Sequence, residues 1–291
     1  MRKAPKRLPA FVYGATSGLF ANPLNPLNPL NPLNPLNPLN PLNPFMFPYL
    51  IHLGDNALIL SQRLGEWCGH GPVLEQDIAL TNISLDLLGQ ARMLLTYAGE
   101  VEGKGRSEDD LAYFRDVHEF RNVLLVEQPN DDWAHTIVRQ FFFDAYNYHH
   151  CQALLQSTDS RLAAIAEKAF KEITYHLRYS SEWTIRLGDG TDQSRQKMQA
   201  AVDDLWPFTG ELTTPNETDR QAAEAGYGVD LTTIKPLWEA KVQAVMQEAT
   251  LQIPESAWMQ SGGKDGRHTE NLGYILAEMQ YLQRAYPGQQ W

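Results

Sequence analysis

Residues 74–100 read LEQDIALTNISLDLLGQARMLLTYAGE, and this stretch decides the fold. Its apolar residues recur at helical spacing but point in nearly every direction around the axis. We therefore expect one long helix at about Leu74–Glu100, lying at the centre of the protein. The apolar positions are Ile78, Leu80, Ile83, Leu85, Leu87, Leu88, Leu94 and Leu95.

The chain on either side of this stretch also reads as helix, because alternating runs of Val, Ile and Thr are absent. Glycine and proline stops follow the first and fifth predicted helices. Long helices with short connections are typical of an antiparallel bundle, so we predict an all-α, single-domain fold for residues 46–291 with additional C-terminal helices. The other expected helices cover about 55–67, 108–125, 130 onward, 160–187, 193–205, 231–251 and 269–284.

The amino-terminal stretch is different in kind. Residues 22–42 are tandem copies of Asn-Pro-Leu, and a proline at every third position prevents helix and sheet. We predict that residues 1–45 are disordered and lie outside the fold, with Met46 as the start of the functional protein. A proline-rich recognition segment is the alternative interpretation.

Charge and cysteine content limit the partners. The formal net charge is −11, which disfavours nucleic acid and anionic membranes as partners because they would repel the chain. Cys68 and Cys151 are far apart and form no CxxC motif, which favours a reducing, cytoplasmic location without a disulfide. The sequence contains no run of about 18 apolar residues, so we expect no transmembrane helix.

Polar residues recur at four-residue spacing inside otherwise apolar helices. Carboxylates from four helices that meet in a bundle core are how di-iron oxygenases build their metal site, with a Glu from each of two helices and a Glu-x-x-His pair from each of the other two. The candidates for such a site are Asn82, Asp86 and Gln90, then Gln140, Asp144 and Tyr148, then Glu172 and His176, with Gln62 and Glu66 on the first helix.

Both Glu-x-x-His positions are broken in this sequence. The first window reads Asp86-Leu-Leu-Gly89, where glycine offers no ligand, and the second reads Ile173-Thr-Tyr-His176, where isoleucine replaces the carboxylate. Such a set leaves a metal pair under-coordinated. We therefore expect no metal, cofactor or catalytic site in this chain, and vestigial ligand positions at Asp86, Gly89, Asp144, Ile173 and His176.

Three interpretations stay open at these positions. Buried polar groups need partners, so Asp86, Gln90, Asp144 and His176 are expected to hydrogen bond to one another. Glu172 and His176 also have the spacing of a helix-surface pair. A reduced metal site built from Asp86, Asp144, Glu172 and His176 would make the chain an enzyme in its own right.

Other motifs are weaker. His149, His150 and Cys151 are adjacent on a helix and do not share a face, so they predict no metal site. Neither a GxSxG elbow nor a glycine-rich nucleotide loop is present. Residues 262–268 read GGKDGRH, which favours a flexible, basic connection before the last helix that could contact an anionic ligand or partner.

Several stretches together resemble the C-type component family of bacterial phenylacetyl-CoA epoxidases (1,2-phenylacetyl-CoA monooxygenases). They span essentially all of Leu53–Trp291 and leave out the amino-terminal repeat. They are LGDNALILSQRLGEWCGH at 53–70, LDLLGQAR at 85–92, LLVEQPN at 124–130, YHLR at 175–178, HTE at 268–270, LAEMQYLQR at 276–284 and PGQQW at 287–291.

The resemblance implies a ferritin-like protein that has lost its metal ligands and supports a related catalytic partner in phenylacetate catabolism. In that family, the catalytic partner holds the di-iron centre and binds phenylacetyl-CoA, and small subunits and a reductase complete the system. Contact with phenylacetyl-CoA would then occur only through the complex. We expect the interface with the catalytic partner on the first two helices and on Trp67, Trp133 and Trp183. A helical binding module unrelated to oxygenation is the remaining alternative.

Overall fold

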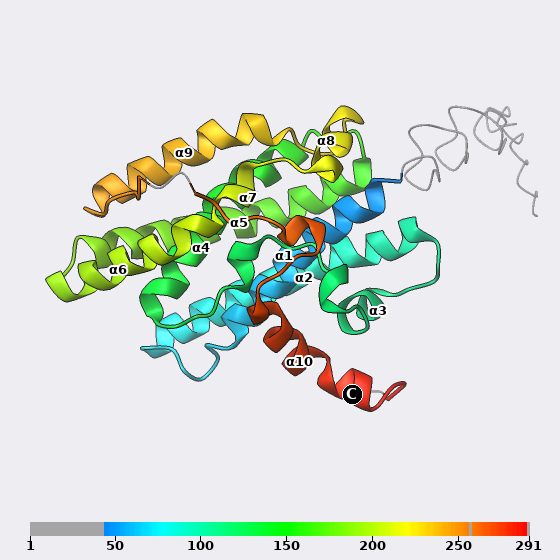
Figure 1. Cartoon of the computed structure of the whole chain (residues 1–291), viewed down its shortest axis with the longest axis horizontal. Helices are drawn as coiled ribbons and strands as arrows, with labels where there is room; N and C mark the ends of the chain where they lie inside the picture. Colours follow the sequence, from blue (N-terminus) through cyan, green and yellow to red (C-terminus); the bar gives the residue numbers. More distant parts are fainter. Residues whose placement is uncertain (1–43, 256–257, 290–291) are drawn as a thin grey trace, which may run out of the picture. The chain divides into compact units, whose positions relative to one another are not determined.

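Four long helices form the body of the described part of the chain (Figure 1). The computed structural model describes residues 44–255 and 258–289, so most of the predicted disordered extension lies outside the described residues. The long helices are α1 (Met46–Gly65), α2 (Leu74–Glu102), α4 (Trp133–Leu154) and α5 (Ser160–Gly188). Helix α1 packs along α2, and α4 packs along α5. The described residues contain no strand, which confirms the all-α prediction.

The ends of the long helices follow from local chemistry. The Asp132 carboxylate caps α4 by accepting a hydrogen bond from the His135 amide, and Asp159 caps α5 by accepting from Leu162. Helix α2 ends at Gly103, whose φ of 68° is left-handed. The connections from α1 to α2 and from α4 to α5 are short, so each of these pairs runs antiparallel, whereas α3 and a longer segment separate α2 from α4.

Shorter helices complete the fold, as the predicted C-terminal additions require. Helices α6 and α9 pack on α4 and α5, and α10 contacts α1 and α3. The four-residue α7 and the eight-residue α8 were not expected from the sequence. The elements are α3 (Glu108–Tyr113), α6 (Asp192–Leu205), α7 (Gly210–Thr213), α8 (Glu217–Glu224), α9 (Leu231–Glu248) and α10 (Glu270–Ala285).

The predicted helix at 108–125 is wrong beyond Tyr113. After α3 the chain continues as a strap, residues 117–127, with two short 3-10 turns at Val117–Glu119 and Leu124–Glu127. Side chains of α1 hold its backbone open: Asp55 accepts from the Arg121 amide and Asn56 accepts from the Val123 amide, each at 2.8 Å. Tertiary hydrogen bonds therefore replace the helical ones in this segment.

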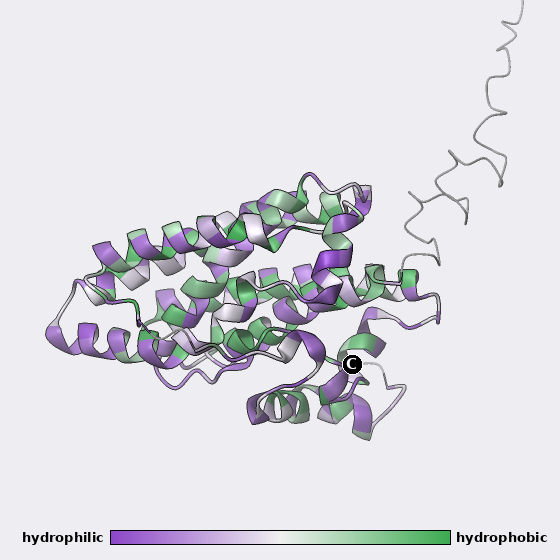
Figure 2. Cartoon of the chain, turned by 45° about the horizontal axis from the view of Figure 1, so that its top comes forward, coloured by the Kyte–Doolittle hydropathy of each residue, from purple (hydrophilic) through white to green (hydrophobic). Residues whose placement is uncertain are grey.

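The prediction that α2 lies at the centre is also wrong. Its inner face is buried through Leu80, Ile83, Leu87 and Leu94, but a second apolar face is open to solvent. Helix α1 is the central element, since most of its residues are buried. Hydrophobic and hydrophilic residues alternate along the long helices in Figure 2, as expected for elements with one packed face.

Candidate functional site

Asp86 and His176 meet across the seam between α2 and α5. The distance between Oδ2 of Asp86 and Nε2 of His176 is 3.0 Å. The His176 ring is fully buried, whereas the Asp86 side chain is 36% exposed. The other ring nitrogen of His176 has no hydrogen-bond partner. Of the two ring nitrogens of His176, only Nε2 has a hydrogen-bond partner, and that partner is a carboxylate of the same chain.

Asp144 lies deeper, on α4, with both carboxylate oxygens occupied. Gln140 donates to Oδ1 at 2.7 Å, and the Ser180 hydroxyl donates to Oδ2 at 2.8 Å. Burial raises the pKa of Asp144 to about 6, although nearby His176 and the two hydrogen bonds favour the ionised form. The cost of desolvating the Asp144 carboxylate is larger than the stabilisation that these contacts give, so the ionised form of Asp144 is destabilised in the bundle core.

A third pair, Gln90 and Glu172, also links α2 to α5, with the Gln90 amide donating to Glu172 at 3.0 Å. The predicted helix-surface pairing of Glu172 with His176 is therefore replaced by two bonds that cross between helices. Further pairs extend the same seam toward both ends. They join Gln76 to Tyr179, Tyr97 to Asp159 and Glu100 to Arg161.

The structure brings some of the predicted positions together and separates others. Asp86, Asp144 and His176 lie around one part of the seam, and Ile173 points into the core beside them. Gly89 does not join them, because it is exposed and a Cβ added there would meet nothing within 4 Å. Glu66, directly after α1, is exposed and pairs with Arg63 and Asn130.

These donors do not fit a di-iron centre. Such a centre needs carboxylates and histidines from four helices converging on one space. Across residues 44–255 and 258–289, no group of three or more His, Cys, Asp or Glu side chains is placed to hold a metal ion. The nearest candidates are each bonded to a different neighbour, so the polar groups satisfy one another in separate pairs rather than as the single network expected.

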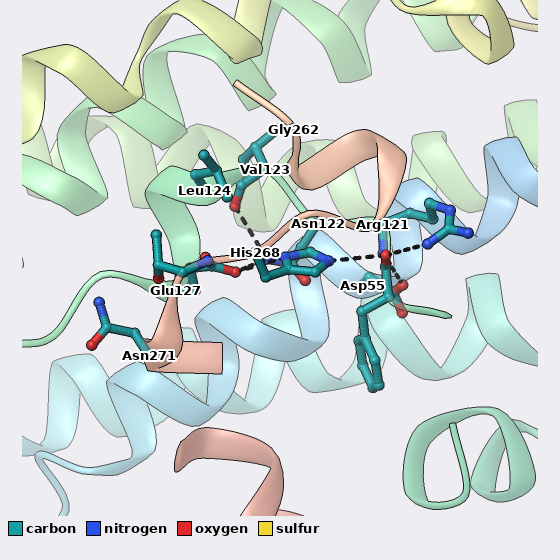
Figure 3. Close-up of polar contacts among 12 residues, drawn as sticks. Asp55, Arg121, Asn122, Val123, Leu124, Glu127, Gly262, His268 and Asn271 are labelled. Atoms are coloured by element: carbon teal, nitrogen blue, oxygen red, sulfur yellow. Dashed lines mark hydrogen bonds and ion pairs between the residues drawn. The ribbon is translucent and has the colours of Figure 1, made fainter. Parts of the chain in front are cut away.

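A second buried polar cluster was missed by the sequence reasoning. Glu127 is fully buried in the strap and receives hydrogen bonds from Asn122, from the Thr269 amide and from the His268 ring (Figure 3). Glu211 accepts from the amides of Leu124 and Gly262. Together they bind the strap to the segment that leads into α10.

His268 holds this cluster together with both ring nitrogens. Nε2 lies 3.0 Å from the Phe120 carbonyl and Nδ1 lies 2.9 Å from Glu127 Oε2. A carbonyl only accepts, so Nε2 carries a proton. The remaining contact also needs a proton between Nδ1 and the carboxylate. His268 and Glu127 therefore form a buried, proton-sharing pair.

The prediction that residues 262–268 form a flexible basic connection is wrong. Lys264 is buried, and its ammonium donates to Asp219 at 2.7 Å, so it is not free for an anionic ligand. Gly263 is required by close packing, because a Cβ there would lie 2.3 Å from the Asn122 carbonyl oxygen. The glycines fit the segment against the strap instead of cradling a phosphate.

The predicted interface tryptophans form an edge-to-face cluster within the chain. Ring centroids of Trp67 and Trp133 are 5.3 Å apart, and those of Trp133 and Trp183 are 6.2 Å apart. His150 and Cys151 are both buried, and burial lowers the pKa of His150 to about 3 and raises the pKa of Cys151 to about 12. Both cysteines are free.

This all-helical bundle, with polar pairs joining its long helices, defines a ferritin-like protein. The chain belongs to the phenylacetic acid catabolic protein family, whose model matches residues 41–291. It is 56% identical over 243 residues to the C-type component of the 1,2-phenylacetyl-CoA epoxidase of Escherichia coli (strain K12), and the match covers 84% of this chain and 98% of that protein. The resemblance and fold expected from the sequence are confirmed.

Among the described residues, none of the helices is long and apolar enough to cross a membrane.

Proposed function

We propose that this chain is the non-catalytic structural component of a phenylacetyl-CoA ring epoxidase in aerobic phenylacetate degradation. Residues 46–291 would form one ferritin-like domain that supports the di-iron catalytic partner, with small subunits and a reductase completing the complex. The observation that carries the proposal is how the candidate ligands are used: Asp86 is paired with His176, and both oxygens of Asp144 accept hydrogen bonds. Its free cysteines fit a cytoplasmic complex.

Loss of the metal role follows from what these groups already do. To bind a cation, Asp144 would have to give up its hydrogen bonds from Gln140 and Ser180. Losing the first of these bonds leaves the buried Gln140 amide donor unsatisfied, at about 1–3 kcal/mol. The polar groups therefore serve to join helices, which is a structural role.

The open face of α2 is the surface that we assign to the catalytic partner. Leu74, Ile78, Leu85 and Leu88 lie on one stripe and are 71%, 51%, 59% and 41% exposed. A stable interface buries about 800 Å² on each partner and has an apolar centre, which such a stripe supplies. Exposed Gly89 adds no side chain beside it, so a partner helix can approach closely. This face agrees with the expectation of an interface on the first two helices.

Co-expression with the catalytic partner tests the proposal. The tagged wild-type chain should recover that partner, and Leu85→Glu and Ile78→Glu should lose it. Leu237→Glu is the matched control, because Leu237 lies on α9 with 47% exposure and should leave recovery unchanged. Equal recovery by all variants would remove α2 as the interface.

Metal content separates this proposal from the free-standing enzyme. The purified chain, supplemented with iron or manganese, should bind neither stoichiometrically, and the complex should oxidise phenylacetyl-CoA only when the catalytic partner is present. Stoichiometric metal in the isolated chain that is lost on replacing Asp86 or His176 would overturn the structural assignment. Failure to recover any ferritin-like partner from cells grown on phenylacetate would favour an unrelated binding module.

A further inference from the structure

A cavity of about 50 Å³ lies in the bundle interior, between α1, α2, α4 and α5. Its walls are mostly apolar, and small side chains on α5 leave the space open: Ala166 and Ala169 line it opposite Leu94 of α2 and Phe143 of α4. Ile173, at one of the predicted vestigial ligand positions, forms part of the same wall. Tightly packed interiors contain few spaces of this size, so the cavity needs an explanation.

None of the lining residues is Asp, Glu, Lys or Arg. The two lining groups that can titrate near neutrality elsewhere are held neutral here, since burial lowers the pKa of His150 to about 3 and raises the pKa of Cys151 to about 12. A charged ligand would enter without any compensating charge, at a high desolvation cost. The cavity therefore selects against ions and phosphates.

The cavity also offers little polar surface to a water molecule. Besides Cys151, the polar side chains in the wall are Asn56, Gln90, Tyr146, Asn147 and His150, and three of these bond to groups outside the cavity. Asn56 accepts from the Val123 amide, Gln90 donates to Glu172, and Nε2 of His150 contacts the Tyr49 hydroxyl at 3.3 Å. A buried water needs two to four polar partners, and apolar cavities without them stay dry.

We propose that this cavity is a binding site for a small, neutral, apolar molecule. An engineered apolar cavity of about 150 Å³ binds benzene or xenon. A space about one third as large admits a single xenon atom or a molecule of two or three heavy atoms, and excludes an aromatic ring. The site is separate from the α2 surface assigned to the partner and does not depend on that assignment.

Xenon is the probe for the test, with the full chain observed by methyl NMR under xenon pressure. Saturable shifts should appear at the methyl groups of Leu94, Leu162 and Ile173, which line the cavity. Ala166→Leu and Ala169→Leu fill the space and should abolish these shifts. Ala164→Leu is the matched control, because Ala164 is exposed on the same helix and its replacement should leave them intact.

Leu94→Ala provides a variant in the opposite direction. It enlarges the cavity, so benzene should raise the melting temperature of Leu94→Ala and leave that of the wild type unchanged. The wild-type xenon response decides the proposal even when a filling variant does not fold. Absence of saturable shifts at the three lining residues, ordered water in the cavity, or equal shifts in the filled variants would overturn it.

Discussion

Asp144→Asn should stabilise this protein at pH 8, although it removes a charge that has two hydrogen-bond partners. Burial raises the pKa of Asp144 from 3.8 to about 6, so the folded state binds the proton more tightly than the unfolded state. Stability is then highest below pH 4, falls as the pH rises from about 4 to 6, and stays reduced above that. Each pKa unit corresponds to about 1.4 kcal/mol, so the ionised carboxylate costs about 3 kcal/mol above pH 6.

Asparagine keeps the shape and most of the contacts. Its carbonyl oxygen can still accept from Gln140, and its amide can donate to the Ser180 hydroxyl, which itself donates to the His176 carbonyl. The neutral side chain does not suffer the cost of ionisation. The variant should therefore be more stable than the wild type by up to about 3 kcal/mol at pH 8, and this gain should shrink toward zero near pH 4.

Urea unfolding of the isolated chain between pH 4.5 and 8 measures this difference directly. Asp203→Asn serves as the control, because Asp203 is exposed on α6 and should show no trend of this kind. A wild-type-minus-variant difference that does not change with pH would refute the reasoning. So would an Asp144→Asn variant that is less stable than wild type at pH 8, since this would mean that the hydrogen bonds outweigh desolvation.

Three further outcomes are expected. Asp86→Leu should cost about 1–3 kcal/mol in a urea titration because it strands buried His176, yet should leave the assembly and activity of the complex intact; loss of activity with assembly intact would contradict the non-catalytic role. His268→Ala should cost about 3–5 kcal/mol, since it leaves Glu127 buried without its proton-sharing partner, and the double variant with Glu127→Gln should recover part of that loss in the same titration. Lys264→Met should expose the α8 region to proteolysis by stranding Asp219, while Arg267→Met, at an exposed site, should leave the digestion pattern unchanged.

The long helices were predictable because their signals are local. Residues 74–100 and 160–187 carry helical periodicity that ends at glycine, and the structure extends the predicted ends by one or two residues. The broken ligand pattern was also readable, since Ile173 cannot coordinate a metal whatever the fold. Both inferences depend on residue type and spacing, and neither depends on distant parts of the chain.

The strap and the site pairs required tertiary information. Residues 114–125 have the composition of a helix. Asp55 and Asn56, more than 60 positions earlier, instead accept hydrogen bonds from the backbone amides of Arg121 and Val123. Likewise, nothing local to GGKDGRH indicates that Lys264 meets Asp219 or that His268 meets Glu127. The glycines were the available signal: they also fit a close approach of two backbone segments, which is the role that Gly263 has.

The wrong prediction that α2 lies at the centre of the protein is the one most relevant to function. Apolar residues all around a helix indicate burial on all sides, but within this chain α2 buries only one side, through Leu80, Ile83 and Leu87. Exposed apolar surface of this extent is unusual in a protein that acts alone. The sequence pattern is therefore consistent with a helix that becomes central only in the assembled complex. On this reasoning the polar seam with α5 fixes the orientation of α2, and its open stripe is left for the partner.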